Sequence, residues 1–186
     1  MRKVVAGLDL TTKAGLVVVE YTGADIVPVY QGVVSSKPAT LRCADRTYNI
    51  AQQIIEVLNK FGVSEVMIED YGGRFKSSLI VLAELGGVVK LYLSLNQIKF
   101  QVVSPTMLKK FFTGKGTADK NIMIKEAYKR YGFDTDSDDI ADAFALSVFA
   151  LALGGADVNL PKTNLETVQD YLTPKQKKPR KTTGLS

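Results

Sequence analysis

Residues 3–34 of the 186-residue chain read KVVAGLDLTTKAGLVVVEYTGADIVPVYQGVV, and this stretch decides the fold. Three apolar runs, at 3–8, 15–21 and 26–34, are separated by short turns, which predicts three consecutive strands. Because the connections are short, the three strands are expected to form an antiparallel meander. Pro28 predicts that the third strand lies at an edge of the sheet or begins late.

From residue 41 onward the pattern changes to helices that alternate with strands. Apolar residues at helical spacing predict helices, and short apolar runs between them predict two more strands. This order predicts an α/β protein with a five-stranded mixed sheet and helices on both faces, a layout similar to the ribonuclease H-like fold. The predicted helices cover residues 41–61, 75–95, 105–112, 120–131 and 139–153, and the two further strands cover residues 64–70 and 99–104.

The composition excludes several kinds of active site. The chain contains no histidine, so it cannot hold a Ser-His-Asp triad, a Cys-His dyad or a histidine-bound metal. Its one cysteine, Cys43, cannot form an internal disulfide, and this usage is typical of the reducing cytoplasm. Any catalytic metal would have mainly oxygen ligands, which favours Mg²⁺ or Mn²⁺. The apolar runs are too short to predict a membrane-spanning helix, and the N-terminus reads as a strand and not as a signal peptide.

Four acidic residues stand next to apolar segments, at positions where their side chains can meet. Asp9 ends the first predicted strand, and Glu69 ends the apolar run VMIE. Asp139 and Asp142 lie three residues apart at the start of the last apolar helix, so they share one face of it. Since the ends of neighbouring strands lie at one edge of a sheet, the four carboxylates are expected to converge on one cleft.

Converging carboxylates require a cation between them. Two unit charges roughly 4 Å apart repel by about 4 kcal/mol at an effective dielectric constant of about 20, so the bare cluster is unstable or has raised pKa values. The positive charge of a pair of divalent ions removes the repulsion. The ions also supply chemistry, because one activates a water that attacks a phosphodiester and the other stabilises the leaving oxygen. The cluster therefore predicts a two-metal nuclease site.

Each acid also has a structural explanation when it is taken alone. Asp9 can start the turn that follows it by bonding its own backbone. Asp139 is one of several acids favoured by the macrodipole at a helix start, and Glu69 can pair with a nearby lysine. The nuclease interpretation depends on the four acids together with the order of the strands.

Four segments of this chain resemble motifs of the RuvC family of Holliday junction resolvases. The segments are GLDLTTKAG (7–15), MIED (67–70), GKGTADK (114–120) and DDIADAFALS (138–147), in an order and with separations that fit over residues 1–153. The resemblance implies that the catalytic metal ligands are Asp9, Glu69, Asp139 and Asp142, which would hold two Mg²⁺ ions or Mn²⁺ in their place. It also implies that Lys120 is a catalytic residue, which contacts DNA phosphate or the charge that develops near the cut, and that Lys115 is a weaker candidate for a phosphate contact.

The same resemblance implies partners. The family acts on four-way DNA junctions as a homodimer, and the long helix 75–95 matches its dimerisation helix, which would account for Gly86 and Gly87 by close packing of helices. An aromatic residue after the strand-four Glu enters the junction in the family, and Tyr71 or Phe75 can serve here, beside Arg74 and Lys76 as DNA contacts. Asp70 is expected to point to the opposite face from Glu69 and not to be a ligand.

The last residues differ from the rest of the chain in charge. Residues 173–186 contain five of the 24 Lys and Arg residues and no acid, whereas residues 1–172 carry 19 basic and 19 acidic residues. We therefore expect three parts: a ribonuclease H-like nuclease domain (1–155), a C-terminal extension (156–172) and a basic, disordered tail (173–186). Such a tail can bind a polyanion or can serve only for solubility.

Several functions fit these observations to different degrees. The leading hypothesis is a metal-dependent endonuclease that resolves Holliday junctions. The alternatives are a relaxed nuclease that cuts forks and flaps or an RNA–DNA hybrid, and a module that binds branched nucleic acid without cutting it. An actin-like phosphotransferase, suggested by residues 9–15, needs two such domains, and 186 residues are too few.

Overall fold

A computed structural model of the chain describes residues 2–36, 43–71 and 76–173. They contain one mixed sheet of five strands in the order β3-β2-β1-β4-β5, which confirms the predicted fold class. The strands are β1 (Lys3–Asp9), β2 (Lys13–Tyr21), β3 (Ile26–Ser35), β4 (Glu65–Glu69) and β5 (Lys99–Val103).

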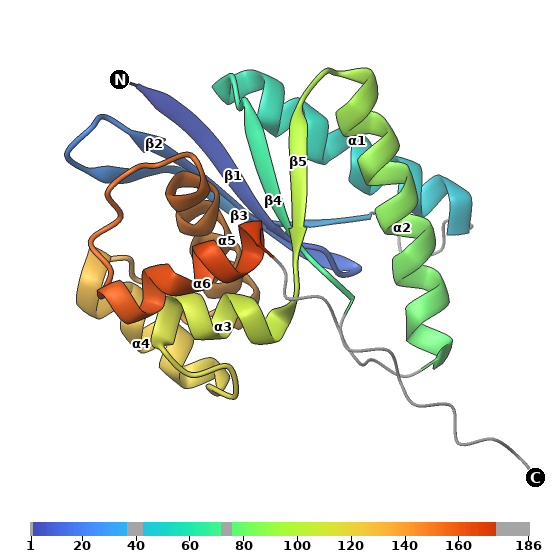
Figure 1. Cartoon of the computed structure of the whole chain (residues 1–186). Coiled ribbons are helices and arrows are strands. Elements are labelled where there is room, and N and C mark those ends of the chain that lie inside the picture. The colour runs from blue at the N-terminus through green and yellow to red at the C-terminus, as the bar shows by residue number, and fades with distance from the viewer. Residues whose placement is uncertain (1, 37–42, 72–75, 174–186) are drawn as a thin grey trace, which may run out of the picture.

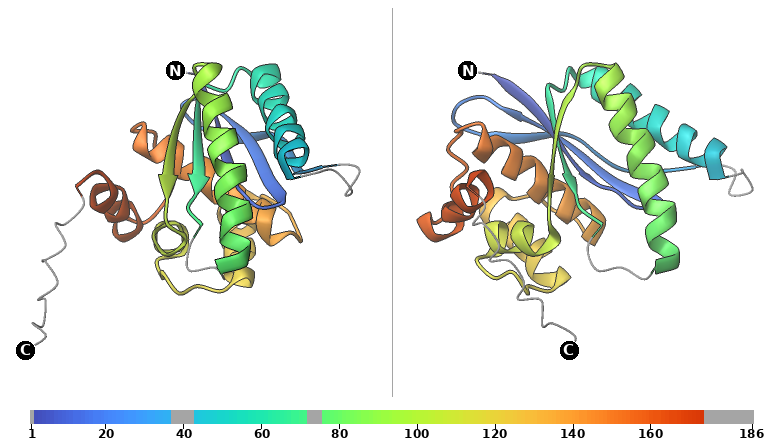
Figure 2. Two further views of the ribbon diagram at one scale, coloured as in Figure 1. Left: turned by 90° about the vertical axis from the view of Figure 1, so that its right-hand side faces the viewer. Right: turned by 45° about the vertical axis from the view of Figure 1, so that its right-hand side comes forward.

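Helices cover both faces of the sheet (Figure 1). The helices α1 and α2 pack on one face, and α3, α4, α5 and α6 pack on the other, so the sheet separates two hydrophobic cores. Figure 2 shows the two layers of helices from the side. The helices are α1 (Cys43–Phe61), α2 (Lys76–Leu95), α3 (Pro105–Thr113), α4 (Lys120–Tyr131), α5 (Asp138–Leu153) and α6 (Lys162–Leu172).

The strand directions bring several chain segments to one edge of the sheet. The strands β1, β4 and β5 are parallel, so Asp9, Glu69 and Val103 end their strands at the same edge. The strands β2 and β3 are antiparallel to their neighbours, and β3 forms the edge of the sheet, as Pro28 predicted. We call the edge where β1, β4 and β5 end the carboxyl edge.

Two glycines allow α5 to lie directly on the sheet. A Cβ on Gly7 of β1 would be 1.8 Å from the backbone oxygen of Ala143, and a Cβ on Gly15 of β2 would be 2.3 Å from that of Asp139. Both distances are shorter than any real contact of a Cβ. Any side chain at these two positions would push α5 away from the strands, and Asp142 with it.

The structure contains a helix, α6, that the sequence analysis did not assign within residues 156–172. The buried Asn164 donates a hydrogen bond of 2.8 Å from Nδ2 to the carbonyl oxygen of Phe111 in α3. Tyr171 donates a hydrogen bond of 3.2 Å to the carbonyl oxygen of Val102 in β5. The helix α6 is thereby held against α3 and the end of β5. The expected boundaries of the three parts of the chain stay a prediction.

The packing of Gly86 differs from the expectation. We expected Gly86 and Gly87 of α2 to permit close contact with another helix, but a Cβ on Gly86 would lie 1.8 Å from the Tyr71 hydroxyl oxygen of the same chain. Gly86 therefore makes room for a side chain that follows β4. Gly87 is exposed, and a Cβ there would have no atom within 4 Å.

Candidate active site

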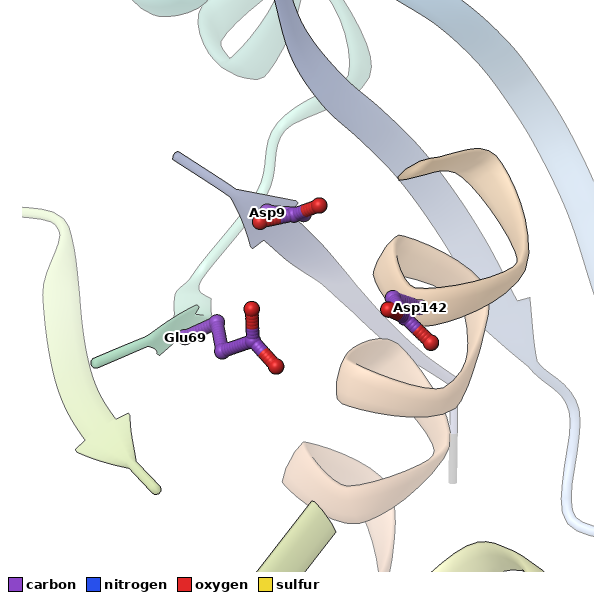
Figure 3. A group of neighbouring side chains, drawn as sticks. All are labelled: Asp9, Glu69 and Asp142. Atoms are coloured by element: carbon purple, nitrogen blue, oxygen red, sulfur yellow. The ribbon is translucent and has the colours of Figure 1, made fainter. Parts of the chain in front are cut away.

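Three of the four predicted acids come together at the carboxyl edge. Asp9 ends β1, Glu69 ends β4 and Asp142 lies in the second turn of α5. Each contributes one carboxylate oxygen to a group in which all three oxygens lie within 4.8 Å of one another. Figure 3 shows the three side chains pointing toward one another from the two strands and the helix. We call these three residues the acidic cluster.

The surroundings of the acidic cluster disfavour negative charge. Asp9 and Glu69 are only 4% and 7% exposed. Burial, followed by the negative charge of Glu69, raises the pKa of the Asp142 carboxyl from 3.8 to about 7. The positive charges of Lys109 and Lys120 act in the opposite direction and lower it.

The acidic cluster has the chemistry of a site for a hard divalent cation. Its donors are carboxylate oxygens, which Mg²⁺ and Mn²⁺ prefer. The Asp142 Oδ1 atom is buried and has no hydrogen-bond partner among the residues that the structure describes. A cation would satisfy this oxygen and offset the repulsion between the carboxylates.

Asp139 lies near the acidic cluster but outside the group of three described residues whose oxygens meet. It is half-buried in the first turn of α5, where its backbone packs against Gly15, the residue that pairs with Asp9 in the sheet. Its negative charge contributes to the raised pKa of Asp142. Its role as a metal ligand stays a prediction.

A family model of "Crossover junction endodeoxyribonuclease RuvC" matches residues 5–150 of this chain. The chain belongs to the RuvC family. The RuvC of Anaeromyxobacter sp. (strain Fw109-5) is 31% identical over 150 residues, which cover 80% of this chain and 72% of that protein.

Solved RuvC structures share the fold. The Thermus thermophilus RuvC structure gives a TM-score of 0.70 at 25% identity and covers 82% of this chain and 97% of that one. The T. thermophilus RuvC in complex with a Holliday junction substrate gives a TM-score of 0.72 at 24% identity and covers 83% of this chain and 98% of that one. All four predicted acids of this RuvC-family chain fall within the matched residues.

The predicted lysines lie around the loop between α3 and α4. Lys120 is the first residue of α4, and the Asp119 carboxylate caps the N-terminus of this helix. The Lys120 ammonium group forms an ion pair with Asp138. Lys115 is exposed in the preceding glycine-rich loop. Their contacts with DNA stay predictions.

Lys109, which the sequence pattern does not single out, acts on the Asp142 carboxyl of the acidic cluster through its charge. Lys109 is half-buried on α3, and its charge is the largest favourable influence on ionised Asp142. The sequence carries a partial signal, which points to this segment but does not distinguish Lys109 from Lys110. Lys109 stands within the run LKKFF, in which Leu108, Phe111 and Phe112 are apolar and prove to be buried.

The predicted DNA contacts after β4 are described only in part. Tyr71 is half-buried, packs against Gly86 and has the Lys90 ammonium 5.2 Å from the centre of its ring. Asp70 is exposed, accepts a hydrogen bond of 2.8 Å from the Tyr71 backbone N–H, and is not among the three acids whose oxygens meet. Arg74 and Phe75 lie outside the described residues, and Lys76 begins α2.

None of the helices among the described residues combines the length and hydrophobicity needed to cross a membrane.

Proposed function

We propose that this chain is a divalent-metal-dependent endonuclease that resolves Holliday junctions and leaves 5′-phosphate and 3′-hydroxyl ends. The observation that carries the proposal is the acidic cluster, at the carboxyl edge of a RuvC-family fold. The RuvC of T. thermophilus, whose fold this chain shares, has been solved with a Holliday junction substrate. A DNA substrate also agrees with the cytoplasmic location predicted from the cysteine content.

The acids and lysines have separate roles in this proposal. Asp9, Glu69 and Asp142 hold Mg²⁺, with Mn²⁺ as a substitute, and Asp139 completes a site for two ions. When bound, such ions supply an activated water and stabilise the charge that develops on the phosphate and the leaving oxygen. Lys109 and Lys120 offset the negative charge that substrate phosphate brings to the cluster. Lys120 and Lys115 contact the DNA backbone.

The exposed face of α2 supports the proposed homodimer. Ile80, Leu91 and Leu95 are 63%, 55% and 69% exposed, and their spacing of 11 and 4 residues places them on one face of the helix. Gly87 lies on the same face with open space above it, so a second copy could approach the backbone closely. A stripe of this kind is typical of a helix that packs against another helix.

A substitution that introduces a charge among the exposed apolar residues of α2 tests the proposed dimer. Leu91→Asp would place a carboxylate at the contact, so we expect monomers in analytical ultracentrifugation at concentrations where the wild type is dimeric. Val27→Asp is the matched control, because Val27 is 44% exposed on the edge strand β3 and should leave the dimer intact. A wild-type protein that is monomeric at all concentrations would contradict the dimer.

The decisive experiment for the function compares labelled DNA substrates. A four-way junction, a fork, a flap, an RNA–DNA hybrid and a linear duplex are incubated with Mg²⁺, Mn²⁺ or EDTA. We expect symmetrical, metal-dependent cuts at the junction, lost in Asp142→Asn while junction binding is kept. Cuts at forks, flaps or hybrids of similar rate would favour the relaxed nuclease. Tight junction binding with no cleavage under any metal condition would favour the binding module and refute the proposal.

A further inference from the structure

A second polar site lies at the carboxyl edge, on the side of the acidic cluster away from Lys109. It is a pocket between the β1–β2 turn, the end of β3 and the start of α1. Among the described residues that line it, two carry a positive charge, three offer hydroxyl groups and none carries a negative charge. They are Thr12, Lys13, Ser35, Ser36 and Arg46. We call it the cationic pocket.

The backbone around the cationic pocket is fixed by hydrogen bonds. Thr11 Oγ1 accepts a hydrogen bond of 3.1 Å from the Lys13 N–H and donates one of 2.8 Å to the Lys13 carbonyl oxygen. Lys13 and Ser35 are paired in the β2–β3 ladder. Gln53 of α1 donates a 3.2 Å hydrogen bond to the carbonyl oxygen of Ser35, which holds α1 against the end of β3. The backbone of Lys13 and Ser35 is therefore held in place before any ligand binds, which lowers the entropic cost of binding.

The sheet register sets the distance from the pocket to the acidic cluster. Asp9 pairs with Gly15, which is two residues from Lys13 in β2, and Ser35 lies one strand farther out. With strands about 4.8 Å apart and a rise of about 3.4 Å per residue, Lys13 and Ser35 lie roughly 8–12 Å from Asp9. Successive phosphates of one DNA strand lie farther apart than the axial rise of about 3.4 Å per nucleotide, because the backbone winds around the helix axis, so this distance corresponds to about one to two nucleotides.

The chemistry of the pocket suits a backbone phosphate. The Lys13 ammonium and the Arg46 guanidinium supply positive charge, and guanidinium geometry matches phosphate oxygens. The hydroxyl groups of Thr12, Ser35 and Ser36 can donate to the remaining oxygens. Arg46 lies in the first turn of the 19-residue helix α1, next to Asp45, so the partial positive charge of the helix N-terminus is shared between the pocket and this carboxylate.

We propose that the cationic pocket binds a phosphate of the DNA strand that is cut, about one to two nucleotides from the scissile phosphate. The inference rests on the proposed function, since it needs a DNA strand in the acidic cluster. The cut strand is then held on both sides of the cluster, by Lys13 and Arg46 beyond β2 and by Lys109 and Lys120 from α3 and α4. Contacts on both sides of the acidic cluster fix the position of the scissile phosphate more closely than contacts on one side alone.

The test neutralises the pocket and compares two readouts. Lys13→Gln, Arg46→Gln and the double variant are assayed for junction binding in EDTA over a range of salt concentrations. We expect the double variant to bind about 10-fold or more weakly at low salt, with the slope of log K against log salt lowered by about 1–2. The charge-matched control is Lys60→Gln with Lys99→Gln, at the opposite edge of the sheet, which should leave the slope unchanged.

Phosphate ethylation interference locates the contact. Wild-type cleavage first maps the scissile phosphate, and this step alone tests the proposed function. In the double variant, interference should disappear at a phosphate about one to two nucleotides from the cut and persist elsewhere. An unchanged salt slope, or a lost contact far from the cut, would overturn the pocket assignment while the nuclease function stands. Lys13→Gln alone, at an exposed position, keeps the test valid if Arg46→Gln fails to fold.

Discussion

At the scale of single residues, Asp142 links the charge of the site to the stability of the fold. Burial and the charge of Glu69 raise its pKa from 3.8 to about 7. The folded, metal-free protein therefore binds more protons than the unfolded chain between these two values. For this reason the contribution of Asp142 to the free energy of unfolding falls as the pH rises from about 4 to about 7.

Asp142→Asn should remove this pH dependence. We expect the metal-free variant to match the wild type near pH 4 and to be more stable by about 2–4 kcal/mol at pH 8, because asparagine carries no charge. Urea unfolding in EDTA at pH 4–8 measures the difference. Asp134→Asn, at an exposed position before α5, is the control and should follow the wild-type profile. Parallel profiles for wild type and Asp142→Asn would contradict the prediction.

Two adjacent lysines on α3 provide an internal comparison. Lys109 acts on the acidic cluster, whereas Lys110 forms an ion pair of 3.0 Å with Asp170 of α6. We expect Lys109→Gln to lower kcat for junction cleavage by about 10- to 100-fold, since a positive charge beside the reacting phosphate is lost. Lys110→Gln should leave kcat close to the wild-type value. Equal losses in single-turnover assays of both variants would show that Lys109 has no special position.

The sequence predicted the acids better than the lysines for a physical reason. Asp9 and Glu69 interrupt apolar strands, and a charge at the end of a buried strand is visible in the pattern. Asp142 follows Asp139 at helical spacing in an otherwise apolar helix. Lys109 is one of two lysines in LKKFF, and only the packing of α3 distinguishes the one whose charge acts on Asp142 from the one that pairs with Asp170 of α6.

At the scale of elements, the contact between α5 and the strands β1 and β2 assembles the acidic cluster. Gly7 and Gly15 have no side chain, so the backbone of α5 lies directly against both strands. Asp142 reaches Asp9 and Glu69 only because of this close approach. In the segment GLDLTTKAG, the two glycines at its ends are therefore as necessary for assembling the acidic cluster as Asp9.

Gly7→Ala should separate the helix from the sheet. The added methyl group would lie 1.8 Å from the Ala143 oxygen, which is backbone and cannot rotate away. We expect a loss of about 1–3 kcal/mol in stability from overpacking, and a loss of cleavage of about 100-fold at temperatures where the variant is still folded. Circular dichroism melts and cleavage rates measure both effects.

The control for this change is Gly154→Ala. There the added methyl group meets mainly the flexible end of the Lys3 side chain, so stability and cleavage should change little. Wild-type cleavage by Gly7→Ala would mean that α5 can shift without moving Asp142, and it would contradict the proposed role of the glycine.

The strands and α1–α5 could be predicted from the sequence, whereas α6 could not. The first five helices carry apolar residues at regular helical spacing. In α6 the buried face includes the polar residues Asn164 and Thr167, and Asn164 is satisfied only by the Phe111 carbonyl oxygen in α3. A hydrophobicity pattern cannot show a face that is buried through a hydrogen bond to another helix. The prediction that Gly86 packs against another helix was wrong for a similar reason, since the residue that contacts it, Tyr71, follows β4.

At the scale of the whole molecule, α6 determines where the basic C-terminal residues begin. The Tyr171 hydroxyl group donates to the carbonyl oxygen of Val102, one residue before Val103, which pairs with Glu69 in the sheet. The described chain thus leaves α6 at the carboxyl edge, beside β5. The sequence after this point carries Lys175, Lys177, Lys178, Arg180 and Lys181, which lie outside the described residues.

Neutralising these five residues to glutamine should weaken junction binding through the DNA backbone. We expect the slope of log K against log salt to fall by about 2–4, while cleavage at saturating protein and low salt stays near the wild-type rate. Fluorescence anisotropy in EDTA at several salt concentrations measures the slope. A second variant carries the same glutamines and a copy of residues 174–186 fused before residue 1, next to Lys3 at the opposite edge of the sheet. This variant restores the net charge, so full recovery of binding would mean that the position set by α6 does not matter. Failure to recover would show that the basic residues act because they begin at the edge where the strand is cut.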